Sequence, residues 1–248
     1  AIPLHGELRL IDPHGGQADL RAGLLRVLHP RSFQDDPTRA LRAARYAARF
    51  DFELESETAA LLREADLATV SVDRRDAELR RLAGEVEAAR GFFLLVEWGL
   101  VELRERGAEL LAGVAELLES DPWRELVPRD CALLVAALGP VGGEEALAEA
   151  RPERPSEAVA LAALRDPTEL ALARALGAEW LDRYLTEWRD VALEIDGEDL
   201  IAAGIPQGPE IGRGLQEALR RKLDGEIADR GQELDVALEV AKGSDGVA

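Results

Sequence analysis

The chain has 248 residues, and its 49 acidic against 30 basic residues give a formal net charge of -19. That balance excludes a protein that coats nucleic acid indiscriminately, because an anionic surface repels phosphate. A single cysteine excludes a disulfide framework. Apolar runs too short to span a bilayer, together with the lack of a signal peptide, predict a cytoplasmic protein with no membrane partner.

The positive charge is almost all arginine and is concentrated near the start of the chain. Only Lys222 and Lys242 are lysines, whereas seven arginines fall within residues 21–49. Asp35 and Asp36 are the acidic residues of that stretch. Because arginine suits bidentate contact with phosphates and base edges, this distribution predicts one anionic ligand held at one place.

The residues that dominate the chain are helix formers, and they predict an all-α protein. A weak alternation over 8–11 predicts one short strand, which needs a sheet that the chain does not supply. Asp36 as N-cap and Pro37 as the first helical residue predict a helix that runs to about Arg49. Further helices, delimited by Ser, Pro and Gly residues, are predicted to start at Ser56 and near Ser71 and to cover 92–105, 107–119, 129–138, 143–150, 155–164, 167–175 and 177–189. A breaker-rich cluster at 204–212 precedes a last pair of helices.

The helix that opens at Asp36 has a polar face of unusual composition. At 100° per residue, Arg39, Arg42, Arg45 and Arg49 share one side, with Asp36 at its top beside Arg39. A solvated basic face is the plain alternative. Exposed basic faces normally carry acidic partners four residues away, and the helical residues 38–49 contain no acidic residue.

A carboxylate beside a guanidinium can select bases by their pairing edges. The carboxylate accepts a hydrogen bond from an exocyclic amino group, while the guanidinium donates to the neighbouring nitrogen or carbonyl. Cytosine and adenine present that amino group, whereas uracil and guanine present a carbonyl. The pair Asp36 and Arg39 is therefore predicted to accept C and A and to reject U and G.

These residues lie in a series of motifs that resembles the bacterial class II tRNA nucleotidyltransferases, a family that includes CCA-adding enzymes and poly(A) polymerases. The resemblance is carried by residues 12–16 with Asp19, 33–50, Ser71 with Arg74 and Glu78, 199–204, 208–212 and 223–225. It implies an elongated multi-helix array with a short N-terminal β remnant of a head domain. The implied parts are a head remnant and joint at 1–30, a neck with the nucleotide-templating helix at 31–70, a helical body at 71–190 and a tRNA-binding tail at 191–248.

The resemblance also implies roles for individual residues. Asp36 and Arg39 pair with the base of incoming CTP or ATP, and Arg42 and Arg45 contact the nucleotide. The other implied sites are a head–neck joint (Asp12, Gly15, Gly16, Asp19), support for the template helix (Ser71, Arg74, Glu78) and RNA binding (Gly208, Gly212, Arg220, Arg221, Lys222). For the two tail glycines, a plain turn and a close helix contact are an equally good interpretation.

The metal-binding carboxylates of the family are not found in this sequence. They belong to a head domain that binds Mg²⁺, so the expected catalytic and metal-ligand residues here are none, and the chain alone is predicted to be inactive. Residues 1–4 resemble the segment that follows the head, which suggests a fragment or a headless gene. The alternatives are a headless RNA-binding module and an acidic helical scaffold that binds protein. Addition of CCA, of A, of CC or of a poly(A) tail all stay open.

Overall fold

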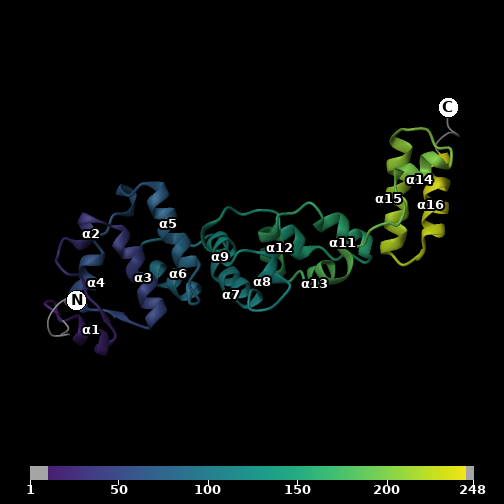
Figure 1. Cartoon of the computed structure of the whole chain (residues 1–248). Coiled ribbons are helices and arrows are strands. Elements are labelled where there is room, and N and C mark those ends of the chain that lie inside the picture. Colours follow the sequence, from purple (N-terminus) through teal and green to yellow (C-terminus); the bar gives the residue numbers. More distant parts are fainter. Residues whose placement is uncertain (1–10, 244–248) are drawn as a thin grey trace, which may run out of the picture. The chain divides into compact units, whose positions relative to one another are not determined.

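The computed structural model describes residues 11–243 of the chain. Apart from two strands of two residues each, these residues form helices and loops (Figure 1), which confirms the all-α prediction. The strand predicted over 8–11 falls, except for Ile11, outside the described residues. No helix between residues 11 and 243 is long and apolar enough to cross a membrane. The chain divides into two compact units, Ala1–Gly142 and Gly143–Ala248, while the finer division into four parts stays a prediction.

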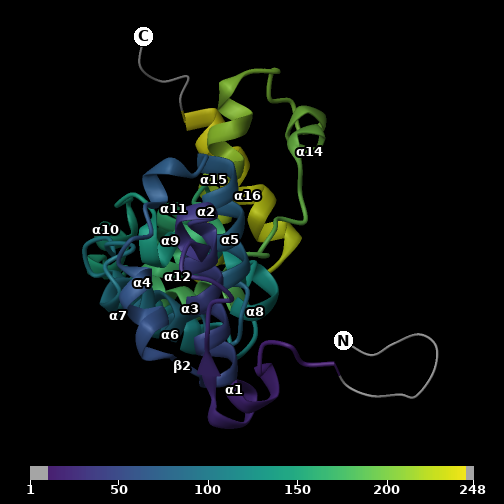
Figure 2. The same ribbon diagram turned by 90° about the vertical axis from the view of Figure 1, so that its left-hand side faces the viewer.

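The first unit begins with a short helix and a parallel pair of strands that the sequence did not predict. The strand β1 pairs with β2, which is labelled in Figure 2. Leu24 is opposite Glu53 and Leu25 is opposite Leu54. The elements of this part are α1 (Gly16–Ala22), β1 (Leu24–Leu25), α2 (Ser32–Asp35), α3 (Thr38–Phe50), β2 (Glu53–Leu54) and α4 (Ser56–Leu62).

Helix α3 is amphipathic and packs its small apolar face into the first unit. Its buried apolar residues are Ala40, Leu41, Ala44, Ala47 and Ala48, and the helices that it packs against are α5 and α6. Because alanine side chains are short, α5 and α6 can approach α3 closely on this face. The remaining elements of the unit are η1 (Leu67–Thr69), α5 (Val72–Ala83), α6 (Ala88–Glu97), α7 (Gly107–Leu117), α8 (Trp123–Leu126) and α9 (Arg129–Leu138).

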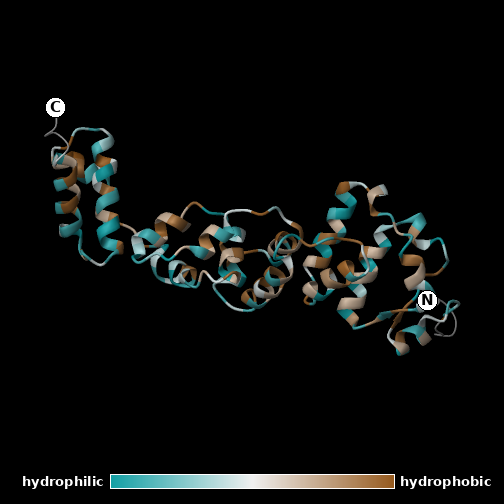
Figure 3. Cartoon of the chain, turned by 180° about the vertical axis from the view of Figure 1, so that it is seen from behind, coloured by the Kyte–Doolittle hydropathy of each residue, from teal (hydrophilic) through white to brown (hydrophobic). Residues whose placement is uncertain are grey.

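The second unit contains a group of short helices and a C-terminal hairpin. Its elements are α10 (Glu144–Glu149), α11 (Pro155–Ala162), α12 (Pro167–Ala175), α13 (Trp180–Arg183), a π-helical turn η2 (Tyr184–Trp188), α14 (Gly197–Ala202), α15 (Pro209–Leu223) and α16 (Arg230–Gly243). Helices α15 and α16 pack side by side, and hydrophobic residues alternate with hydrophilic ones along both (Figure 3). We call this pair the tail hairpin. Its core includes Leu200, Ala218, Val236 and Ala237.

The close contact inside the tail hairpin occurs at Gly214. A Cβ atom at this position would lie 2.5 Å from the carbonyl oxygen of Ala237, so only glycine fits without a shift of α16. A Cβ at Gly212 would meet nothing within 4 Å. The close helix contact that was the plain interpretation of Gly208 and Gly212 is made instead by Gly214, which the sequence analysis did not single out.

Candidate nucleotide and RNA site

Asp36 lies directly before α3 and caps its first turn. Its backbone is extended (φ -152°, ψ 94°), and its Oδ1 accepts hydrogen bonds from the backbone N–H of Thr38 at 3.1 Å and from the Thr38 hydroxyl at 2.6 Å. The first N–H groups of a helix lack intrahelical acceptors, so this bond satisfies one of them. The helix begins at Thr38 and Pro37 is its N-cap residue, one position later than predicted, but the Asp36 carboxylate still binds the first turn and its direction is thereby fixed.

Arg74 reaches the same carboxylate from α5. Its Nη2 lies 3.2 Å from Oδ1 and 3.3 Å from Oδ2 of Asp36. Partial burial raises the pKa of Asp36, but the two bonds from Thr38 and the charges of Arg74 and Arg39 outweigh it and lower the pKa below the usual value. Asp36 is therefore an anion at neutral pH and acts as an acceptor only.

Arg39 is exposed one turn further along α3. Its Nη1 donates to the backbone carbonyl of Ser32 at 3.2 Å. No carboxylate in the described part of the chain forms an ion pair with Arg39, although its charge is close enough to lower the pKa of Asp36. The structure thus places an unneutralised guanidinium near the Asp36 carboxylate, without a direct bond between them.

A pocket of about 290 Å³ opens beside these residues. Arg39, Arg42 and Tyr46 of α3 line it. Apolar side chains from β1, the segment after β1, α2 and β2 also line it: Leu25, Val27, Leu28, Phe33 and Leu54. The volume is near the small end of the range for ligand pockets, about 300 Å³ and above. Asp36 does not itself line this pocket.

The arginines further along α3 are held by carboxylates from α5 and the turn after it. Glu78, whose side chain is 8% exposed, pairs with Arg42 at 3.6 Å and with Arg45 at 3.2 Å. Arg45 also lies 3.6 Å from Glu85, and both guanidinium groups donate to the hydroxyl of Tyr46. Arg42 lines the pocket, whereas Arg45, only 12% exposed, does not. Of Arg42 and Arg45, which were both predicted to contact the nucleotide, only Arg42 lines the pocket, together with Arg39.

The residues predicted to support α3 do contact it or lie beside it. Arg74 binds Asp36, and Glu78 binds two arginines of α3 while it also accepts from Arg81 at 2.6 Å. Ser71 directly precedes α5, but its side chain makes no capping bond.

The predicted joint forms the start of α1. The Asp12 carboxylate accepts from the N–H groups of Gly16 and Gln17, each at 2.9 Å, and these bonds lower its pKa, the Gln17 bond most. Gly15 has φ 69°, a conformation that favours glycine. Asp19 forms an ion pair with Arg26 at 3.1 Å, and Arg26 also lies 3.5 Å from Glu55. The sequence analysis missed Arg26, which has no spacing that links it to the other site residues. It also missed Tyr46, although Tyr46 is four residues after Arg42 on the same helix and its position could have been read from that spacing.

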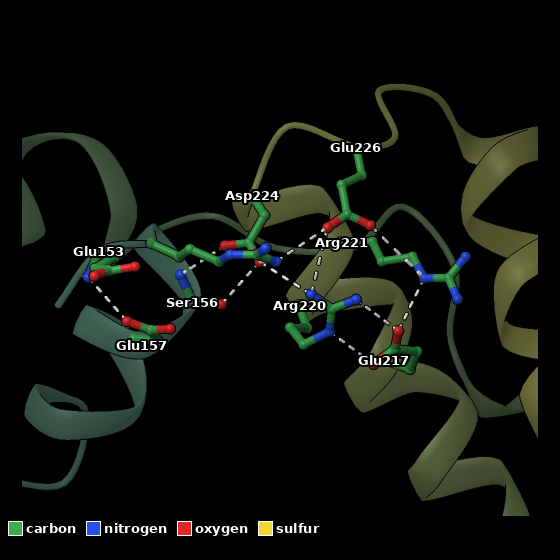
Figure 4. Close-up of polar contacts among 9 residues, drawn as sticks. Glu153, Ser156, Glu157, Glu217, Arg220, Arg221, Asp224 and Glu226 are labelled. Atoms are coloured by element: carbon green, nitrogen blue, oxygen red, sulfur yellow. Dashed lines mark hydrogen bonds and ion pairs between the residues drawn. The ribbon is translucent and has the colours of Figure 1, made fainter.

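The basic residues predicted to bind RNA all have carboxylate partners (Figure 4). Arg220 donates to Glu217 through two nitrogens at 2.8 Å and to Asp224 at 3.0 Å, and Arg221 donates to Glu217 at 2.8 Å. Lys222 donates to the fully buried Glu233 at 2.6 Å. Gly208 has extended backbone immediately before α15, and Gly212 lies in the first turn of that helix.

The described residues offer no site for a metal ion. Between residues 11 and 243, no group of three or more His, Cys, Asp or Glu side chains is placed to hold one. The Mg²⁺ implied by the resemblance therefore does not fit the residues present.

Comparison with known proteins shows which proteins this chain resembles. No protein-family model matches the chain. An A-adding tRNA nucleotidyltransferase of Halalkalibacterium halodurans is 41% identical over 100 residues, which cover 37% of this chain and 23% of that protein. A multifunctional CCA protein of Nitrosococcus oceani is 42% identical over 112 residues, which cover 43% of this chain and 27% of that protein.

The solved structures extend the likeness over almost the whole chain. The Thermotoga maritima CCA-adding enzyme complexed with tRNA superposes with a TM-score of 0.77 and 26% identity, over 92% of this chain and 67% of that one. The chain is similar to tRNA nucleotidyltransferases over part of their length. A complex of a CCA-adding enzyme with ATP gives a TM-score of 0.72 and 25% identity, over 94% of this chain and 66% of that one.

The predicted resemblance to the tRNA nucleotidyltransferases is thus confirmed. The matches span about a quarter of the length of these curated tRNA nucleotidyltransferases.

Proposed function

We propose that this chain is the nucleotide-selecting and RNA-holding part of a tRNA nucleotidyltransferase that extends tRNA 3′ ends from CTP, ATP or both. The observation that carries the proposal is the anionic Asp36 carboxylate, fixed by Thr38 and Arg74, with the unneutralised Arg39 close by. The proposal includes Mg²⁺ as the metal of the full enzyme and a cytoplasmic location.

Asp36 and Arg39 select the base by complementary hydrogen bonds. Oδ1 of Asp36 is occupied by Thr38 and Arg74, whereas Oδ2 has only the 3.3 Å contact with Arg74 and keeps capacity to accept an amino proton. The Arg39 guanidinium exchanges its bond to the Ser32 carbonyl for an acceptor on the base. A uracil or guanine carbonyl facing Asp36 leaves two acceptors without a proton between them, at a cost of about 1–3 kcal/mol.

Nucleotide binding tests this selection. We expect the chain to bind CTP and ATP more tightly than UTP and GTP, by roughly tenfold or more for a penalty of that size. Asp36→Ala should remove the preference. The matched control is Asp35→Ala, because Asp35 is the adjacent carboxylate but pairs with the exposed Arg31 at 3.7 Å and does not contact Thr38 or Arg74. Equal binding of all four nucleotides by the unmodified chain would overturn the base-selecting role.

Inactivity of the chain alone stays a prediction. Phosphoryl transfer of this type needs metal ions held by carboxylates, and residues 11–243 provide no such group. Incubation of the chain with Mg²⁺, CTP, ATP and a tRNA that lacks its 3′ end should give no extension.

A further inference from the structure

Asp224, which follows α15 directly, is a buried carboxylate with partners on two elements. Its side chain is 4% exposed. It accepts from the backbone N–H and the hydroxyl of Ser156, both at 3.0 Å, and from Arg220 at 3.0 Å (Figure 4). Arg154 lies 3.7 Å away. A carboxylate offers about four acceptor sites, so Asp224 is fully satisfied by groups of its own chain.

Ser156 belongs to the first turn of α11, where N–H groups lack helical acceptors. Pro155 begins this helix, and no capping side chain precedes it. The carboxylate of Asp224 accepts the N–H of Ser156 and places a negative charge at the positive end of α11. A residue 68 positions later in the sequence thus caps α11 and joins it to the tail hairpin.

The arginines around Asp224 are neutralised within the same cluster. Arg154, which precedes α11, lies 3.6 Å from Glu226, and Arg220 lies 3.4 Å from the same carboxylate. We call the whole set the tail network: Arg154, Ser156, Glu217, Arg220, Arg221, Asp224 and Glu226. Its three arginines and three carboxylates cancel in formal charge, so the network has no excess positive charge to attract RNA phosphate.

We propose that Asp224 is a positioning residue that fixes the tail hairpin against α11, and that Arg220 and Arg221 act through this network instead of contacting phosphate. The inference rests on the proposed function, because it takes the tail to be an RNA-holding surface. An RNA that touches both α11 and the tail hairpin binds more tightly when the two are held in one arrangement, because less conformational freedom is lost on binding.

The salt dependence of RNA binding separates positioning from direct contact. The probe is an RNA hairpin with the acceptor stem and 3′ end of a tRNA. For Asp224→Asn and for Arg220→Gln we expect the affinity at fixed salt to fall by about tenfold, with an unchanged slope of log affinity against log salt concentration. Loss of a phosphate contact would instead reduce the slope by about 1.

A control variant and a second measurement complete the test. Glu210→Gln is the matched control, because the 2.9 Å ion pair between Glu210 and Arg213 lies within α15 and reaches no other helix. The affinity of this variant for the RNA hairpin should equal that of the unmodified chain. Amide hydrogen exchange at Ser156 should be faster in Asp224→Asn than in the unmodified chain, because the acceptor of that N–H is weakened.

The outcomes are distinguishable. If the unmodified chain fails to bind the RNA hairpin, the RNA-holding function is wrong, whereas the exchange experiment still tests the joint between α11 and the tail hairpin. If the unmodified chain binds, and Arg220→Gln lowers the slope by about 1 while Asp224→Asn leaves the affinity unchanged, the positioning role is wrong.

Discussion

The four arginines of α3 differ in what surrounds their charged groups. Arg39 is exposed and donates to a backbone carbonyl, while Arg42 is 45% exposed and 3.6 Å from Glu78. Arg45 is 12% exposed between two carboxylates, and Arg49 is 55% exposed and 3.7 Å from Glu85. A ligand competes most easily for the guanidinium that is least neutralised. We therefore propose nucleotide contact for Arg39 and Arg42 and a structural role for Arg45.

Substitution of Arg42 and Arg45 should separate these two roles. Arg45→Ala removes one of the partners of Glu85 and one of the partners of Glu78, and we expect the free energy of unfolding to fall by about 2 kcal/mol. Arg49 still pairs with Glu85 and Arg81 with Glu78, which limits the loss. Arg42→Ala should lower the free energy of unfolding by less than about 1 kcal/mol, because the ion pair between Arg42 and Glu78 is long and the Arg42 side chain is half exposed. Urea unfolding measures both values. Equal destabilisation by the two substitutions would contradict the assignment.

Glu55 gives a prediction for the pH dependence of stability. Its carboxylate accepts from the N–H groups of Glu57 and Thr58 at the start of α4, and these bonds lower its pKa to about 2. A carboxyl whose pKa is lower in the folded state stabilises the fold above its unfolded pKa of 4.5, and this contribution is lost as the pH falls towards 2. Glu55→Gln cannot ionise. The difference in unfolding free energy between the two proteins should therefore be constant above about pH 5.5 and shrink between pH 5 and 2; a difference that does not vary with pH would contradict the capping role.

The proximity of Asp36 and Arg39 could be predicted from the sequence, but the ion-pair partners of the α3 arginines could not. Asp36 and Arg39 are neighbours along one helix, so their proximity follows from helical spacing. Helix α3 contains no acidic residue, which favoured a ligand-binding face. Their acidic partners, Glu78 and Glu85, come instead from α5 and the turn after it. Spacing along one helix carries no information on ion pairs between helices.

At the scale of elements, helix boundaries were predictable where breakers mark them. The predictions 129–138 and 167–175 coincide with α9 and α12, which begin next to or at proline. The prediction 92–105 was displaced, because α6 begins at Ala88 and ends at Glu97. The segment 177–189 is interrupted by a π-helical turn, and two-residue strands such as β1 have no periodicity to detect.

The tail hairpin provides a prediction at this scale. Gly214→Ala places a methyl group 2.5 Å from the Ala237 carbonyl, so α15 and α16 must separate, and we expect a loss of about 1–3 kcal/mol. Gly212→Ala is the control, because the same methyl group meets nothing within 4 Å and alanine favours a helix by up to about 1 kcal/mol over glycine. Thermal unfolding measures both. Similar shifts for the two variants would show that the close contact is not tight.

At the scale of the whole molecule, the chain divides into two compact units, and the boundary along the sequence lies between Gly142 and Gly143. The segment that joins them has no regular structure over residues 139–143. Each unit has its own buried apolar residues, so the stability of one should depend little on the other.

An insertion in this segment tests that independence. Six Gly and Ser residues placed after Val141 should leave the unfolding temperature of each unit within about 1 °C, since flexible insertions in an exposed segment cost little. Gly214→Ala in the same background should lower only the transition of the second unit, as followed by hydrogen exchange. Loss of both transitions together on insertion would show that the units stabilise each other.

The pairing of β1 with β2 has a consequence for α3. Because Leu25 is the partner of Leu54, the 28 intervening residues form a closed ring of backbone that contains the whole helix. Neither end of α3 can unwind freely until the two strands separate. Amide protons along α3 should therefore exchange at rates tied to the opening of a ladder only two residues long, and faster when a proline replaces Glu53, whose N–H donates to the carbonyl of Gly23.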